Sequence, residues 1–152
     1  MAQFSDPAIV LRTEGNSTSA IALTGSAFDL PLVYLNSDGE PMSLTGFTLS
    51  AKAQVYRGVF ADDGKLEEII GSALSNDVIP VPVAPHSDQT RNVGVFILDV
   101  QSDLLPADYR DVAIDAPELP FLAIWVRFAA PGGKPIDQIR VALGYRRGFG
   151  SF

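Results

Sequence analysis

Apolar and polar residues alternate with a period of two along much of the chain, which is the spacing of β-strands with one buried face. In residues 47–57, the odd positions from 47 to 55 are apolar and the even positions from 48 to 54 are polar. In residues 26–35, Phe, Leu, Leu and Tyr at 28, 30, 32 and 34 share one face, and Asp, Pro, Val and Leu at 29, 31, 33 and 35 share the other. Residues 93–100 and 121–129 are nearly continuous apolar runs, typical of central strands covered on both faces. Residues 139–145 are expected to form the last strand.

Turn sequences separate these strands. Asn-Ser-Asp-Gly at 36–39, Asp-Asp-Gly at 62–64 and Pro-Gly-Gly-Lys-Pro at 131–135 combine residues that favour tight turns. About seven or eight strands, separated by turns, predict an all-β fold, namely an antiparallel β-sandwich of Ig-like or jelly-roll-like type. We expect one sandwich domain at 1–145 and a C-terminal arm at 146–152.

Residues 63–75 fit two structures. The apolar residues at 66, 69, 70, 73 and 74 have helical spacing, and Asp62 or Asp63 would cap such a helix. Gly71 weakens a helix by about 1 kcal/mol, and the alternative is the return strand of an Asp-Asp-Gly hairpin. The prolines at 80, 82 and 85 then mark an extended edge or a loop, because proline cannot donate to a strand ladder.

Length and composition indicate one globular domain that needs no metal or disulfide. The chain has 152 residues, of which 47% are hydrophobic, and it contains no cysteine. Its longest apolar runs are far shorter than the roughly 20 residues that a membrane span needs. The first residues lack the basic and apolar stretches of a signal peptide. We therefore expect a soluble protein made in the cytoplasm, with no membrane partner.

The net charge of −7 argues against nucleic-acid binding, which depends on clustered Lys and Arg. The charge is uneven, because residues 1–119 carry 6 basic and 17 acidic side chains whereas residues 120–152 carry 5 basic and one acidic. An acidic body joined to a basic end favours attraction between neighbouring copies. The alternative is that the basic end lies on the acidic body of its own chain.

No pattern in the sequence indicates an enzyme, a metal site or a cofactor site. The single histidine, His86, precedes Ser87 and Asp88, but adjacent residues cannot align a nucleophile, a base and an orienting acid. Zinc requires several His or Cys ligands, and neither Asp-Gly turn has the ligand spacing of a calcium loop. A pair of carboxylates for glycoside hydrolysis would meet only in space, and chance pairs are common among 18 acidic residues.

The C-terminal segment combines the residue types that anchor protein interfaces. Tyr145, Phe149 and Phe152 are apolar aromatics, and Arg146 and Arg147 lie between them. We expect this arm to contact an acidic surface on a neighbour. The alternative is that the arm docks on its own domain.

Three segments resemble a known family. They are Phe-Asp-Leu-Pro-Leu at 28–32, Asp-Gly-Glu-Pro-Met-Ser-Leu-Thr-Gly-Phe-Thr-Leu at 38–49 and Ala-Lys-Ala-Gln-Val at 51–55. The pattern resembles the N-terminal β-sandwich of siphophage upper baseplate proteins and related phage tail and fibre proteins. Its centre is a corner at which Gly46 bends the chain while Leu44 and Phe47 bury on either side. Residues 104–110 are similar to a further family segment, with Asp108 where glycine is more usual.

The resemblance implies a structural protein of the virion that docks onto a larger assembly in the tail or baseplate. Its partners would be other virion proteins and copies of itself. A capsid decoration protein is the first alternative. A carbohydrate-binding module, which would use exposed aromatic residues, is the alternative from another class.

Overall fold

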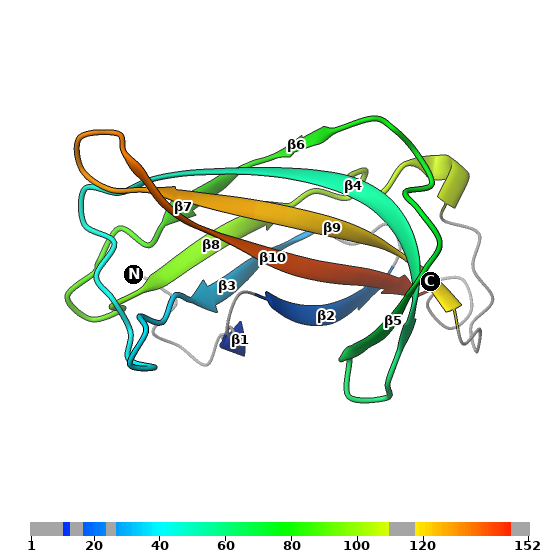
Figure 1. Cartoon of the computed structure of the whole chain (residues 1–152), viewed down its shortest axis with the longest axis horizontal. Helices are drawn as coiled ribbons and strands as arrows, with labels where there is room; N and C mark the ends of the chain where they lie inside the picture. The colour runs from blue at the N-terminus through cyan, green and yellow to red at the C-terminus, as the bar shows by residue number, and fades with distance from the viewer. Residues whose placement is uncertain (1–10, 13–16, 24–26, 110–117, 147–152) are drawn as a thin grey trace.

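The computed structural model describes residues 11–12, 17–23, 27–109 and 118–146 (Figure 1). Within these ranges the chain is all-β, as predicted, and no helix there is long and apolar enough to cross a membrane. The described elements are β1 (Leu11–Arg12), β2 (Ser17–Leu23), β3 (Phe28–Val33), β4 (Thr48–Phe60), β5 (Leu66–Ile70), β6 (Ile79–Val81), β7 (Val83–Pro85), β8 (Val95–Val100), a single-turn helix (Ala107–Tyr109), β9 (Glu118–Ala129) and β10 (Pro135–Arg146).

The strands form two sheets that pack as a β-sandwich (Figure 1). One sheet has four strands in the order β1-β3-β8-β7. The other has six, in the order β2-β10-β9-β4-β5 with β6 also paired to β4. Most pairs are antiparallel, as predicted, but β1 pairs with β3 and β2 pairs with β10 in parallel. The ten described strands exceed the seven or eight predicted because β1, β2 and the short edge strands have no strong alternation of their own.

The core lies between the two sheets and contains the residues that the alternation placed inward. Those from β3 and β4 are confirmed as predicted, since Leu30, Leu32, Leu49, Ala53 and Val55 are buried there. Strand β8 differs from the prediction. Its second face is covered only at the start of the strand, because Val95 is buried whereas Ile97 is half-buried and Asp99 is exposed.

Residues 66–70 form the return strand of a hairpin, so the helical interpretation of 63–75 is wrong. The backbone N–H of Gly64 donates to the carbonyl of Ala61 at 2.9 Å, and Gly64 has a φ of 88°. Asp63 accepts a hydrogen bond from the backbone N–H of Lys65 at 3.0 Å. Its carboxylate therefore closes a turn instead of capping a helix, and β5 pairs antiparallel with β4.

The β4–β5 hairpin folds over the outer face of its own six-stranded sheet. Strand β4 is 13 residues long and curves at its C-terminal end (Figure 1). There Phe60 covers Gly144 of β10, where an added Cβ would lie 2.8 Å from the Phe60 ring. This packing buries a second apolar cluster outside the sandwich, composed of Phe60, Leu119, Phe121, Ala123 and Ala142. Strand β9 is thereby covered on both faces along this part, as its continuous apolar run predicted.

One hydrogen bond joins the two sheets at the end of the sandwich near the β9–β10 turn. The Tyr34 hydroxyl donates to Oδ2 of Asp137 at 2.6 Å, and the Tyr34 ring stacks on Phe128 with 4.3 Å between ring centroids. Burial raises the pKa of the Tyr34 hydroxyl well above its usual value, and the bond to the Asp137 carboxylate raises it further.

We expect the stability of the protein to fall more steeply at alkaline pH than that of Tyr34→Phe. With a raised pKa, folded Tyr34 stays protonated while the unfolded side chain ionises near pH 10, so its contribution is complete below that pH and is lost above it. At neutral pH the phenylalanine variant should lose about 1–2 kcal/mol with the hydrogen bond. Urea unfolding of both proteins between pH 7 and about pH 11 measures the difference. If the free energies of unfolding of the two proteins changed in parallel with pH across that range, the raised pKa assigned to Tyr34 would be contradicted.

Candidate functional site

The part of the outer face that the β4–β5 hairpin leaves uncovered presents the chain's single tryptophan among basic side chains. We call this surface the Trp125 face. Its residues come from the middle of the sheet, and they are Ser50 and Lys52 of β4, Trp125 and Arg127 of β9, and Gln138 and Arg140 of β10.

The strand register places these side chains in two rows across the sheet. In the first row, Trp125 pairs with Lys52 on one side and with Arg140 on the other. In the second, Arg127 pairs with Ser50 and Gln138. Directly paired residues have Cβ atoms about 4.5–5.5 Å apart, so the cations flank the indole closely. None of these paired positions carries a carboxylate.

Trp125 is held in place by its neighbours on β9 and β4. Its ring meets the ring of Tyr56 edge-on at 6.4 Å between centroids, and Tyr56 in turn stacks on Phe121 at 5.7 Å. The indole therefore rests on the margin of the second apolar cluster and stays partly exposed. An aromatic ring that is already positioned loses little conformational freedom on binding.

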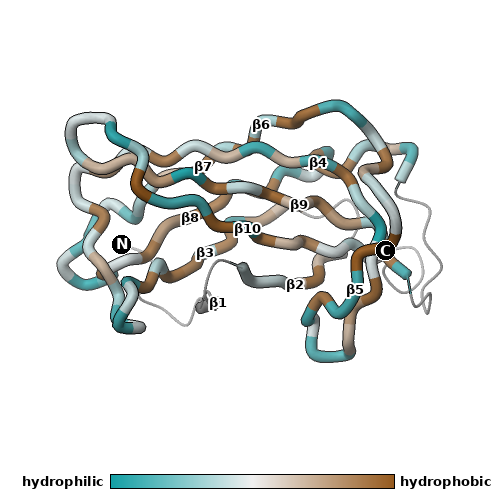
Figure 2. Tube along the Cα trace, viewed as in Figure 1, coloured by the Kyte–Doolittle hydropathy of each residue, from teal (hydrophilic) through white to brown (hydrophobic). Residues whose placement is uncertain are grey.

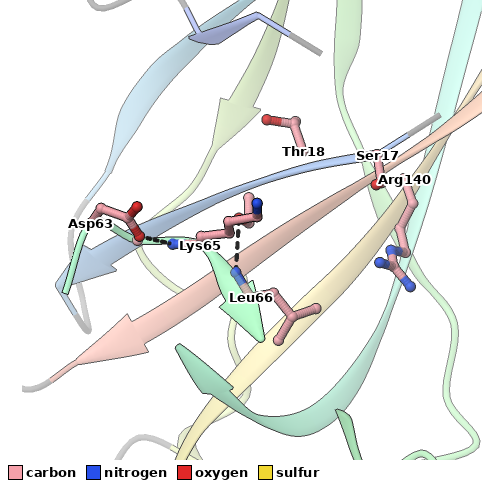
Figure 3. Close-up of a pocket in the computed structure, with 8 residues that line it drawn as sticks. Ser17, Thr18, Asp63, Lys65, Leu66 and Arg140 are labelled. Carbon is pink, nitrogen blue, oxygen red and sulfur yellow. Dashed lines mark hydrogen bonds between the residues drawn. The ribbon is translucent and has the colours of Figure 1, made fainter. Parts of the chain in front are cut away.

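Two hollows adjoin this row. One, of about 150 Å³, is lined by residues of the Trp125 face. The other, of about 350 Å³, lies between β2 and the β4–β5 turn, with Asp63 and Arg140 at opposite ends (Figure 3). In the second hollow the backbone N–H of Leu66 donates to Oγ of Ser19 at 3.0 Å, which ties the turn to β2 (Figure 3).

The chemistry of the Trp125 face suits an anionic partner that also offers apolar surface. The Nε of Arg140 is buried and has no hydrogen-bond partner among the described residues. Tryptophan and arginine are the residue types that most often dominate binding energy at protein interfaces. Among the described residues no cluster of three or more His, Cys, Asp or Glu side chains is placed to hold a metal ion.

The structure separates the predicted interface residues of the C-terminal segment. Tyr145 continues the inward-facing positions of β10 and is only 2% exposed, so it belongs to the core and not to an interface. Strand β10 extends through Arg146, the first residue of the predicted arm. Arg147, Phe149 and Phe152 lie outside the described residues.

The predicted corner is a tight turn. The backbone N–H of Phe47 donates to the carbonyl of Leu44 at 2.9 Å, and Gly46 has a φ of 79°. Leu44 is buried, and Phe47 packs against the core. A Cβ on Gly46 would lie 3.0 Å from Cγ of Pro131, so both the backbone conformation and the space favour glycine.

We expect Gly46→Val to lower the free energy of unfolding by about 1–3 kcal/mol, because valine is strained at this φ and meets Pro131. A thermal melt measures the loss. Gly132→Val is the control, since Gly132 also has a positive φ but nothing within 4 Å of an added Cβ. A Gly46→Val melt within about a degree of the wild type would show that the corner tolerates any residue.

His86 organises a loop. Its Nδ1 accepts a hydrogen bond from the backbone N–H of Asp88 at 2.9 Å, and its carbonyl accepts one from the Gln89 side chain at 3.0 Å. The ring nitrogen is thus engaged within its own loop.

The Trp125 face was not predicted as a site. The sequence pattern correctly placed Lys52 on the polar face of its strand. Arg127 and Arg140 entered the sequence prediction only through the net positive charge of residues 120–152. Part of this site could have been recognised from the sequence. Trp125 and Arg127 are two residues apart in one strand, so they share the face that points away from the core. The pairing of β9 with both β4 and β10 could not be deduced from local patterns.

No family model matches the chain, and no curated protein or solved structure matches it.

Proposed function

We propose that the protein is a structural component of a bacteriophage virion, a docking module of the tail, baseplate or fibre attachment that acts through protein–protein contacts. The resemblance at residues 28–57 suggests the setting. Within that segment the corner at Gly46 is a turn with a positive φ. No enzymatic activity is proposed.

The observation that carries the proposal is the Trp125 face. Trp125 is partly exposed, is held by Tyr56 and lies between Lys52 and Arg140. The indole gives a docking surface its apolar contact, and the two cations orient an acidic partner. This surface lies on the outer side of the six-stranded sheet, away from the core.

Two other functions share this surface. A capsid decoration protein would use the same kind of contacts at a different place on the particle. A carbohydrate-binding module would stack a sugar on Trp125 and bond its hydroxyls to Gln138 and Ser50, which line or flank the smaller hollow. The row of cations favours a protein partner with carboxylates over a neutral sugar.

Gradient-purified particles test the proposal. Quantitative mass spectrometry should find the chain in particles from infected cells at a constant ratio to the major structural proteins. Trp125→Ala supplied in place of the wild type should be depleted from particles, whereas Arg91→Ala, at an exposed loop position, should be retained. A chain that is absent from particles would contradict the virion assignment. Retention of Trp125→Ala at the wild-type level would show that docking uses another surface.

A further inference from the structure

The β4–β5 hairpin is an acidic projection. Between residues 61 and 68 it carries Asp62, Asp63, Glu67 and Glu68 against one basic side chain, Lys65, and all five are exposed. The hairpin extends beyond the body of the sandwich at the lower right of Figure 1. Its turn is strongly hydrophilic in Figure 2, as is the first part of β10 towards the other end of the molecule.

The same hairpin also offers apolar surface. Ile69 follows the two glutamates directly and is 40% exposed, although it is a large aliphatic residue. The carboxylates match the Trp125 face in charge, and Ile69 adds exposed apolar surface on the other side of the strand. The two surfaces of one chain are complementary in charge.

The charge distribution disfavours pairing of two Trp125 faces with each other. Lys52, Arg127 and Arg140 give this face three positive charges, while the chain as a whole carries −7, so the remainder carries −10. Two such faces brought together would repel, whereas the acidic remainder of another copy attracts. A copy's own hairpin is fixed over the covered part of the sheet by Phe60 against Gly144 and by the bond between Leu66 and Ser19.

We infer that copies of this protein associate head to tail, with the β4–β5 hairpin of one copy docked on the Trp125 face of the next. The inference rests on the proposed docking function and names its partner as a second copy. Because each copy docks in one direction only, the contact is heterologous and repeats from copy to copy, which generates a ring when the rotation closes and a filament when it does not. The carboxylates of the hairpin meet the cations of the Trp125 face.

Sedimentation velocity of the purified protein tests this association directly. In low salt and at concentrations up to about 1 mM, the wild type should form species larger than a monomer, and raising the salt should dissociate them because the contact is charged. Arg127→Glu and Glu67→Lys should each weaken self-association about tenfold or more. Their matched controls, Arg91→Glu and Asp103→Lys, make the same charge changes at exposed positions elsewhere and should stay close to the wild type.

Mixing the two defective variants tests whether the hairpin of one copy docks on the Trp125 face of another. Arg127→Glu keeps an intact hairpin and Glu67→Lys keeps an intact Trp125 face, so the mixture should form mixed oligomers that neither variant forms alone. A wild type that remains monomeric would overturn the inference. So would variants that associate like their controls, or a mixture that stays as dissociated as its components.

These outcomes are distinct from failure of the proposed function. A chain that is present in particles but monomeric in solution, and whose variants incorporate normally, would keep its virion role and lose the head-to-tail contact. A chain that associates as described but never enters particles would keep the head-to-tail contact and lose the virion role.

Discussion

Gly94→Ala is expected to lower the free energy of unfolding by about 2–5 kcal/mol, because alanine at this position is both strained and crowded. Gly94 has a φ of 80°, and an added Cβ would lie 2.8 Å from the carbonyl oxygen of Tyr34 and 3.1 Å from the backbone nitrogen of Met42. These are backbone atoms, so they cannot move aside as a flexible side chain would. Urea unfolding at neutral pH measures the loss.

Gly71→Ala separates the two causes. Gly71 has a φ of 73° but nothing within 4 Å of an added Cβ, so this variant should show the cost of backbone strain alone. If Gly94→Ala is no less stable than Gly71→Ala, the close approach of the chain to Gly94 has no energetic consequence.

Gln89→Ala should cost about 2–4 kcal/mol, because one side chain satisfies four backbone groups from separate segments. Its Oε1 accepts hydrogen bonds from the N–H groups of Leu44 and Gly94 at 2.9 and 3.0 Å. Its Nε2 donates to the carbonyls of His86 and Val95 at 3.0 and 2.9 Å. The amide thus fastens the corner before β4 to the loop before β8, and its loss leaves these partly buried groups without their partner.

Chemical denaturation of Gln89→Ala beside Gln101→Ala measures this effect, since Gln101 is exposed at the end of β8. Gln89→Glu adds a second test. It retains an acceptor but loses both donors and places a charge beside two carbonyls, so it should be no more stable than the alanine variant. If Gln89→Ala had the same free energy of unfolding as the wild type, the role assigned to the Gln89 amide would be contradicted.

Features set by local sequence could be predicted. The alternation in residues 47–55 gave the faces of β4 correctly, and the turn residues located the breaks around Gly39, Gly64 and Gly132. Each of these glycines has a positive φ, which is a property that its immediate neighbours suffice to indicate. The corner at Gly46 belongs to the same class.

Features set by distant pairing could not be predicted. Residues 66–70 satisfy helical spacing and strand pairing equally well as an isolated segment, and pairing with β4 decided the outcome. Tyr145 resembled an exposed anchor beside two arginines, but the alternation of β10 carries it into the core. The Trp125 face depends on the register of three strands, and two of its cations belong to segments more than 70 residues apart.

Hydroxyl-radical footprinting of Trp125 tests the docking role of this face most directly. Because the chain has one tryptophan, the oxidation of that residue, followed by mass spectrometry, reports on this surface alone. We expect Trp125 in purified particles to be oxidised several-fold more slowly than in the free protein, relative to the half-buried Tyr109 in the same samples. Equal oxidation of Trp125 in the free protein and in particles that contain it would show that the face remains open after assembly, which would contradict its role as the docking surface.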